Sequence, residues 1–332
     1  MRIRITGHGG EGKFQFGDSG PWKEFEKVFL ENGHEICNAS YEEQADAIIA
    51  NSYNTALEKY LFSLEIPLSK RILVNWEPYI VERVRYRPEV FNRFGSRFAP
   101  SVDWAAKING TSFKWPQDEI IDPDIFLNWF DRSTSAVMIQ GNKFSARKGE
   151  LYSLRRKVLN MLHAKELTLF GTNWNSGLKF DWWHWSRSII NSNFREISLT
   201  SFFGMGRDYD LYKGKIDDKA LVLSKYRICI VIENSADFVS EKLFDAVRAG
   251  CVVVYVGPNL EKYDLPKDSA IQVAPDPNLI VETVRDLQSK SESELMEMAK
   301  IQFVSLKSVS GEWINTKVLR NLAQDMLKLL EK

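Results

Sequence analysis

Short apolar runs alternate with amphipathic stretches through the first part of the chain. Residues 2–6 (RIRIT), 45–52 (ADAIIANS) and 71–76 (RILVNW) have the length and composition of strands. Between them, residues 21–32 and 54–63 repeat their apolar positions at helical spacing. Strands that alternate with helices usually form a parallel sheet with helices on its faces. This part is therefore predicted to be an α/β lobe built on a parallel sheet.

A second series of the same kind begins near residue 135. A strong helical pattern occupies 150–163, and the strand-like runs around it are 135–142 (SAVMIQGN), 167–171 (LTLFG), 226–234 (YRICIVIEN) and 251–257 (CVVVYVG). The break near residues 130–140 predicts an N-terminal lobe at 1–136 and a C-terminal lobe at 137–332. The amphipathic stretch 312–331 is expected to form a closing helix that packs back across the boundary.

The opening of the chain carries a glycine pattern. Residues 7–12 (GHGGEG) spell G-x-G-x-x-G directly after a strand-like run, as in dinucleotide-binding loops. In such loops a helix begins at the third glycine, so that its free N–H groups meet the pyrophosphate. Here KFQFGDSG follows Gly12 without helical periodicity, and the helical pattern starts only at Pro21. The loop is therefore expected to line a cleft rather than to bind a dinucleotide.

Composition narrows the function classes. The 332 residues include 44 Lys and Arg and 44 Asp and Glu, so no basic field favours nucleic acid. No apolar run approaches the roughly 18 residues that cross a membrane. The four histidines show no paired metal spacing, so no metal site is predicted. Three widely spaced cysteines in apolar surroundings, without a visible signal peptide, predict buried thiols in a cytoplasmic protein.

The most informative segment is 226–273. Its apolar run ICIVI reads as a strand, ENSAD as a polar loop, and Ser240 as the N-cap of a helix that ends at Gly250. Ligands of parallel sheets bind at the carboxyl ends of the strands, where this loop and the helix start are expected. Lys242 beside free helix amides would suit a diphosphate. A surface lysine paired with a nearby acid is the alternative.

This segment closely resembles the donor-binding region of the α-1,3-fucosyltransferases, glycosyltransferase family 10. The matching positions are Tyr226, Glu233-Asn234-Ser235, Phe238, Ser240-Glu241-Lys242, Ala249-Gly250 and Gly257-Pro258-Asn259. Upstream, the similar positions are Tyr212-Lys213-Gly214, Asp218-Lys219 and Phe170-Gly171-Thr172-Asn173-Trp174-Asn175. In the first lobe, residues 75–81 (NWEPYIV) are similar to the region that holds the catalytic carboxylate of the family.

The resemblance implies a GT-B enzyme with two Rossmann-like lobes. It would transfer fucose from GDP-fucose to a glycan hydroxyl with inversion, in α-1,3 linkage, without a metal or other cofactor. The first lobe would bind the acceptor, for example a lipopolysaccharide O-chain, with Glu77 as the catalytic base and with His8, Gly9 and Trp183 on the acceptor side. The residues implied for donor binding are Arg155, Asn173, Trp174, Lys213, Glu233, Asn234, Phe238, Glu241 and Lys242.

Some positions depart from the family pattern. Phe238 stands where a tyrosine is common, so it could stack on a base but not donate a hydrogen bond. The phosphate-binding arginine has no clear counterpart after the Phe-Gly strand, and Arg155, Lys213 and Lys179 are the candidates to replace it. Another sugar nucleotide as donor therefore stays open, as does a sugar- or nucleotide-binding protein without catalysis.

The aromatic run 180–188 (FDWWHWSRS) has two interpretations. Its tryptophans either anchor an irregular loop or form a platform on which sugar rings stack. The partners expected for the protein are thus a sugar nucleotide and a glycan, with no nucleic acid. No membrane-spanning segment is expected, and peripheral association with a membrane stays open.

Overall fold

The structure is a computed structural model of the chain and contains two compact units. It describes residues 1–6, 21–37, 44–51, 53, 55–63, 65–121, 124–175 and 209–332. The first unit comprises Met1–Glu119 and Gly311–Lys332, and the second comprises Ile120–Ser310. The boundary expected after residue 136 falls inside a strand of the second unit and is therefore wrong. That strand begins at Ser133, before the apolar pattern of residues 135–142, because its first two residues, Ser133 and Thr134, are polar.

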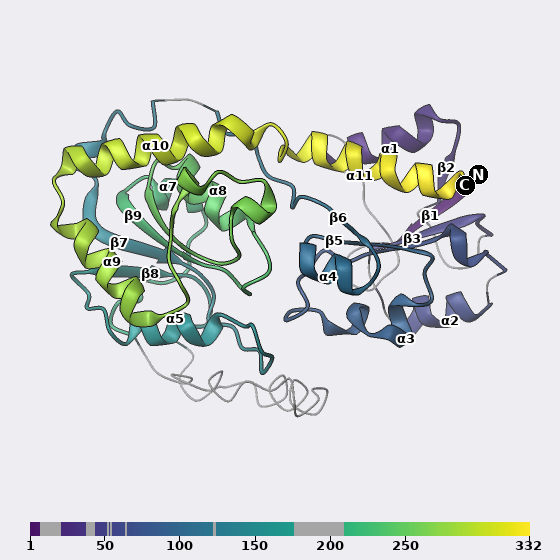
Figure 1. Ribbon diagram of the computed structural model, residues 1–332, viewed down its shortest axis with the longest axis horizontal. Coiled ribbons are helices and arrows are strands. Elements are labelled where there is room, and N and C mark those ends of the chain that lie inside the picture. The colour runs from purple at the N-terminus through teal and green to yellow at the C-terminus, as the bar shows by residue number, and fades with distance from the viewer. Residues whose placement is uncertain are drawn as a thin grey trace. The chain divides into compact units, whose positions relative to one another are not determined.

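The first unit is built on a parallel sheet in the order β2-β1-β3-β4-β5-β6 (Figure 1). Its strands are β1 (Arg2–Thr6), β2 (Glu35–Cys37), β3 (Ala47–Ala50), β4 (Arg71–Val74), β5 (Ser96–Ala99) and β6 (Thr111–Ser112). Its α-helices are α1 (Pro21–Glu31), α2 (Thr55–Ser63), α3 (Pro88–Phe91), α4 (Val102–Lys107) and α11 (Asn315–Leu330). Short 3₁₀ turns are η1 (Leu68–Lys70) and η2 (Arg83–Tyr86).

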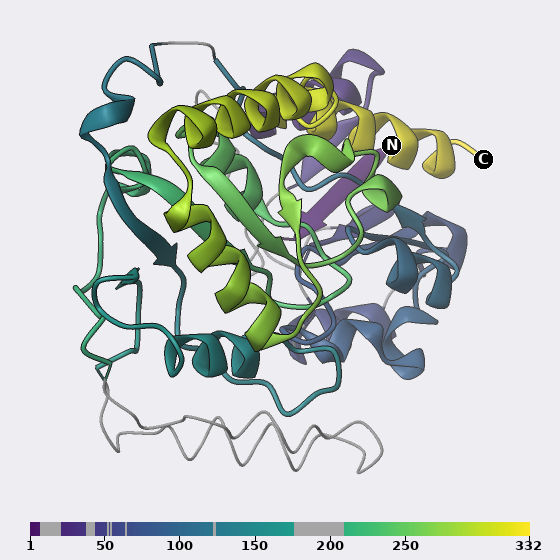
Figure 2. The same cartoon turned by 60° about the vertical axis from the view of Figure 1, so that its left-hand side comes forward.

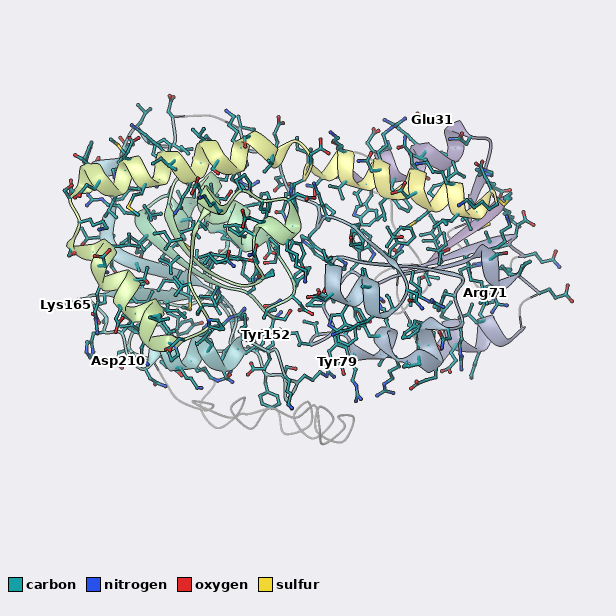
Figure 3. The ribbon with its side chains drawn as sticks, in the orientation of Figure 1. Glu31, Arg71, Tyr79, Tyr152, Lys165 and Asp210 are labelled. Carbon is teal, nitrogen blue, oxygen red and sulfur yellow. The ribbon has the colours of Figure 1, made fainter. Side chains whose placement is uncertain are left out.

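Alternate residues of these strands serve two hydrophobic cores. In β3, Ile49 packs with α1 and α11, whereas Ile48 packs in the separate cluster that contains Leu57 of α2. This alternation follows from the two-residue period of a strand and requires apolar side chains on both faces. Figure 1 shows α11, the last helix, beside α1, and Arg320 of α11 donates a 2.9 Å hydrogen bond to Glu31 of α1 (labelled in Figure 3). The expected return of the C-terminal helix is therefore confirmed.

The second unit contains a parallel sheet in the order β11-β10-β9-β7-β8. Its strands are β7 (Ser133–Ile139), β8 (Leu167–Phe170), β9 (Tyr226–Ile232), β10 (Val252–Val256) and β11 (Ile271–Gln272). Its α-helices are α5 (Tyr152–Leu159), α7 (Lys219–Leu223), α8 (Glu241–Arg248), α9 (Pro277–Ser289) and α10 (Glu292–Ser310). Its 3₁₀ turns are η3 (Trp129–Asp131), η6 (Glu261–Tyr263) and η7 (Lys267–Ser269).

Helices cover both faces of this second sheet. Helices α5 and α9 pack together against β7, β9 and β10 on one face, where Figure 2 shows α9 lying across the strands. Helices α8 and α10 contact each other and β10, and α7 lies beside α8. The three cysteines are buried and form no disulfide, as predicted. The parallel α/β architecture predicted for both units is likewise confirmed.

The strand order reverses at an equivalent place in both parallel sheets. In each unit the second strand lies on one side of the first strand, and the third and later strands lie on the other side. The reversal occurs between β1 and β3 in the first unit and between β7 and β9 in the second. In open parallel sheets, ligands bind beyond the carboxyl ends of the strands at such a switch point. The residues at those ends are therefore candidate site residues.

Candidate functional site

A fully buried carboxylate lies at the carboxyl end of β9. Glu233 follows the last residue of the strand and accepts two hydrogen bonds from Ser240, one from its backbone N–H at 2.8 Å and one from its hydroxyl at 2.7 Å. The ammonium group of Lys242 lies 3.4 Å from the same carboxylate. A buried charge without such partners would be strongly destabilising. The contacts therefore fasten the start of α8 to the end of the strand.

Lys242 lies in the first turn of α8. Ser240 caps this helix, because its hydroxyl accepts from the backbone N–H of Lys242 at 3.4 Å. The ammonium of Lys242 donates to the same hydroxyl at 2.8 Å, and the lysine side chain is only 15% exposed. It is thus paired with an acid, as the alternative interpretation held, but it is not a surface lysine. The helix start and the fixed cation each contribute positive potential to this edge, and the carboxylate of Glu233 offsets part of it.

Glu241 connects Lys242 to a second lysine. Its carboxylate lies 3.9 Å from the ammonium of Lys242 and 3.6 Å from that of Lys219. Desolvation favours the neutral acid, but the two ammonium groups outweigh it and hold the pKa of Glu241 below its ordinary value. Glu241 is therefore ionised at neutral pH and reduces the positive charge that Lys219 and Lys242 present.

Gly257, at the carboxyl end of β10, is packed too closely for any side chain. A Cβ at this position would lie 2.4 Å from the hydroxyl oxygen of Tyr255 and 2.9 Å from Cγ of Glu233. Tyr255 is fully buried, and burial raises the pKa of its phenol well above the ordinary value. The glycine thus allows β10 to approach the buried carboxylate.

Replacing Gly257 by alanine is expected to lower the free energy of unfolding of the second unit by about 1–3 kcal/mol, the usual effect of overpacking a core. Urea denaturation of the two proteins measures it. Gly311→Ala, at a glycine of the first unit, is the control, because no atom lies within 4 Å of a Cβ built there, and its effect should stay within about 0.5 kcal/mol. Equal stability of wild type and Gly257→Ala would show that the site tolerates a side chain.

Arg155 of α5 lies at the switch point between β7 and β9. It donates to the carbonyl of Ile232 at 2.7 Å, to the side chain of Asn234 at 2.9 Å and to the carbonyl of Gly141 at 3.3 Å. Its guanidinium also lies over the ring of Tyr152, labelled in Figure 3. Burial lowers the pKa of Arg155 to about 10, so it stays charged at neutral pH. Because Arg155 is 1% exposed, the expected phosphate contact is not supported, and the residue instead positions both strand ends.

Four other residues implied for donor binding differ in exposure. Trp174 is 1% exposed and donates its indole N–H to the carbonyl of Gln140 at 2.6 Å. The ring of Phe238 is also buried, so neither aromatic residue offers a face for stacking. Asn173 has a left-handed backbone with φ of 64° after β8. Lys213 is exposed. Of the two lysines that could replace the missing arginine, it is the one that lies within the described residues.

Glu77 lies in the loop after β4 of the first unit. The chain beyond Val74 is held in place because Trp76 donates its indole N–H to the side chain of Asn51 at 2.8 Å. Tyr86 donates its hydroxyl to the backbone carbonyl of Glu77 at 2.9 Å. The carboxylate of Glu77 is partly exposed and forms no ion pair with a described residue. The backbone is thus fixed while the carboxylate stays available.

An adjacent ion pair between buried Arg85 and partly exposed Glu82 supports the Glu77 loop. Arg85 donates to the carbonyl of Val74 at 3.0 Å and pairs with Glu82 at 2.8 Å. Burial lowers the pKa of Arg85 and raises that of Glu82, and the charge of Glu77 acts on both groups. The arginine therefore pairs with Glu82 and not with Glu77.

The expectations for His8, Gly9, Trp183 and Lys179 fall outside the described residues. Within the described ranges, no cluster of His, Cys, Asp and Glu has the arrangement of a metal site. The described helices are also too short or too polar to cross a membrane.

The sequence prediction assigned no role to several polar residues at the strand ends. Gln140 after β7 and Ser235 after β9 are buried, and their side chains have no hydrogen-bond partner among the described residues. The same holds for both amide atoms of Asn75 after β4. A polar residue directly after an apolar strand was the available signal, since such residues lie at the ligand-binding edge of a parallel sheet.

Comparison with known protein sequences gives a partial match. No family model matches the sequence. A fucosyltransferase-like protein from Arabidopsis thaliana is 36% identical over 80 residues, which are 23% of this chain and 15% of that protein. The chain therefore matches only a small part of its relative.

Solved structures share the fold over nearly the whole chain. An α1,3-fucosyltransferase superposes with a TM-score of 0.58 at 14% identity, covering 100% of this chain and 90% of the other. Its complex with GDP gives a TM-score of 0.55 at 13% identity over the same shares. Anabaena HepE in complex with UDP-glucose gives 0.56 at 10% identity and covers 99% of both chains. The fold is thus that of GT-B glycosyltransferases, as predicted.

Proposed function

We propose that this protein is an inverting glycosyltransferase that moves fucose from GDP-fucose to a hydroxyl group of a glycan. The observation that carries the proposal is the cluster of Glu233, Ser240 and Lys242 at the carboxyl end of β9. It places a fixed cation at the start of a helix, where parallel sheets bind anionic ligands. The α1,3-fucosyltransferase and its GDP complex, which share the fold, support this choice.

In this proposal the second unit holds the donor. Lys242 and the free N–H groups at the start of α8 bind the diphosphate and stabilise the charge that develops as GDP leaves. Glu233 and Ser240 hold the lysine in place, so that little reorganisation is needed during reaction. Lys213, which is exposed beyond β8, is the additional candidate for a phosphate contact.

The first unit supplies the base. The carboxylate of Glu77 takes the proton of the acceptor hydroxyl as its oxygen bonds to the anomeric carbon of the donor sugar. The bond between that carbon and the β-phosphate oxygen breaks in the same step, and GDP departs with the electron pair. A single displacement inverts the anomeric centre and needs one base, rather than the two carboxylates of a retaining glycosidase.

Two alternatives to this function can be distinguished from it by experiment. The first alternative is an enzyme of the same fold that uses another sugar nucleotide as donor, and the likeness to HepE in complex with UDP-glucose supports it. Binding without catalysis is the other alternative, and the carboxylate of Glu77 argues against it, because a structural carboxylate would be paired and this one forms no ion pair with a described residue.

The donor is identified by thermal stabilisation with a panel of GDP- and UDP-sugars. A ligand at 100 times its dissociation constant should add roughly 2.7 kcal/mol to the free energy of unfolding. We expect this gain with GDP and GDP-fucose, together with slow release of GDP from the latter. Stabilisation by UDP-glucose instead would assign a different donor, and stabilisation without GDP release would favour a binding protein.

A further inference from the structure

A cavity opens in the second unit, at the end of the sheet opposite Glu233. It measures about 510 Å³, within the range of small-molecule sites. Its walls come from the segment that precedes β7, from α7, and from the C-terminal end of α8. These elements meet the amino ends of the strands, so the cavity is separate from the candidate donor site.

The walls of the cavity combine apolar surface with an excess of positive charge. Three cationic and two anionic side chains line it, which leaves one net positive charge (3 − 2). Asp245 is matched by two of the cations, with Lys219 at 2.6 Å and Arg248 at 2.5 Å from its carboxylate oxygens. Ile125 and Ala220 supply apolar wall. A small molecule with one anionic group and an apolar part fits this lining.

The cations of the cavity are connected to the donor edge through one face of α8. Glu241, Asp245 and Arg248 are spaced by four and three residues, so they lie on the same side of the helix. Lys219 contacts two of them, with its ammonium 2.6 Å from Asp245 and 3.6 Å from Glu241. Glu241 in turn lies 3.9 Å from Lys242. A continuous series of charges therefore joins the two edges.

We propose that this cavity is a second ligand site, for a small molecule that carries a phosphate or carboxylate group on an apolar body, and that its occupancy lowers the affinity for the donor. The bound anion attracts Lys219 away from Glu241. The carboxylate of Glu241 then neutralises Lys242 more fully, and the donor diphosphate meets less positive charge. The coupling part of this inference rests on the proposed donor site, whereas the binding part does not.

Phenyl phosphate is the probe, and isothermal titration calorimetry on the full chain measures it. We expect saturable binding to wild type and none for phenol, which lacks the anionic group. Ala220→Phe fills the cavity and should abolish binding, and Arg248→Gln should weaken it about tenfold. Arg285→Gln is the matched control, because it removes an arginine that pairs with Glu166 elsewhere in the same unit.

The location of the bound probe is tested with a variant of the candidate donor site. Lys242→Ala should retain saturable phenyl phosphate binding if the probe occupies the cavity. Loss of binding in this variant, or unaltered binding in Ala220→Phe and Arg248→Gln, would place the probe elsewhere and overturn the inference. Absence of saturable binding to wild type would also overturn it.

The coupling is read by titrating GDP with and without saturating phenyl phosphate. We expect at least about a fivefold loss of GDP affinity in wild type and no loss in Ala220→Phe. An unchanged GDP affinity in wild type would refute the coupling. If GDP does not bind even without the probe, the proposed function fails, while the direct titration still decides whether the cavity binds an anion.

Discussion

Replacing Glu77 by glutamine is expected to reduce turnover by at least about a hundredfold while leaving donor affinity unchanged. Glutamine has nearly the same shape but cannot accept the acceptor proton, and general-base catalysis typically contributes 10²–10⁴-fold, or roughly 3–5 kcal/mol of barrier. The backbone of this loop should not move, because Tyr86 contacts the carbonyl of residue 77 and not its side chain. Release of GDP measures turnover, and calorimetry measures donor affinity.

Glu89→Gln is the control for this experiment. Glu89 is an exposed glutamate of α3, so its replacement removes an equal charge from the same unit. Its turnover should match that of wild type. If Glu77→Gln transfers sugar at close to the wild-type rate, the base lies elsewhere and the role assigned to the first unit is wrong.

Replacing Lys242 by alanine is expected to weaken GDP binding by roughly 1.5–3 kcal/mol, the range for a charge-assisted hydrogen bond. This corresponds to a loss of about tenfold to a hundredfold in affinity. Lys242→Arg keeps the charge and should retain part of the binding. Calorimetric titration with GDP compares the three proteins.

Two controls separate binding from folding. Lys225→Ala removes an exposed lysine of the same unit and should not change GDP affinity. Lys242→Ala also leaves the buried carboxylate of Glu233 with Ser240 alone, so its urea unfolding must be followed in parallel. A folded Lys242→Ala protein with wild-type GDP affinity would show that the lysine serves only the ion pair.

Structural roles that depend on a few neighbouring residues could be predicted from the sequence. Ser240 was predicted as an N-cap, and the structure shows its hydroxyl accepting from the N–H of Lys242. This was possible because a cap depends on a few neighbouring residues. The parallel sheets were predictable for the same reason, since the apolar runs of residues 47–50 and 252–256 need burial on both faces.

Burial of individual side chains could not be predicted in this way. Trp174 matches the family pattern in sequence, and Arg155 is a candidate for the arginine that this pattern lacks, yet each is 1% exposed. Their positions depend on how the ends of β7 and β9 meet, which is set by contacts between residues far apart in the chain. The need for Gly257 likewise arises from Tyr255 and Glu233, which reach it from two different strands. Such packing is a tertiary property that residue spacing does not encode.

Proton NMR of GDP-fucose incubated with the protein tests the central claim most directly. In the absence of an acceptor glycan, water takes the place of the hydroxyl, and the account predicts slow release of GDP. The first fucose to appear should have the anomeric configuration opposite to that of the donor, and Glu77→Gln should suppress its formation. Release of fucose with the anomeric configuration of the donor would contradict an inverting transferase. Binding of GDP-fucose without any change of its spectrum over time would contradict it as well.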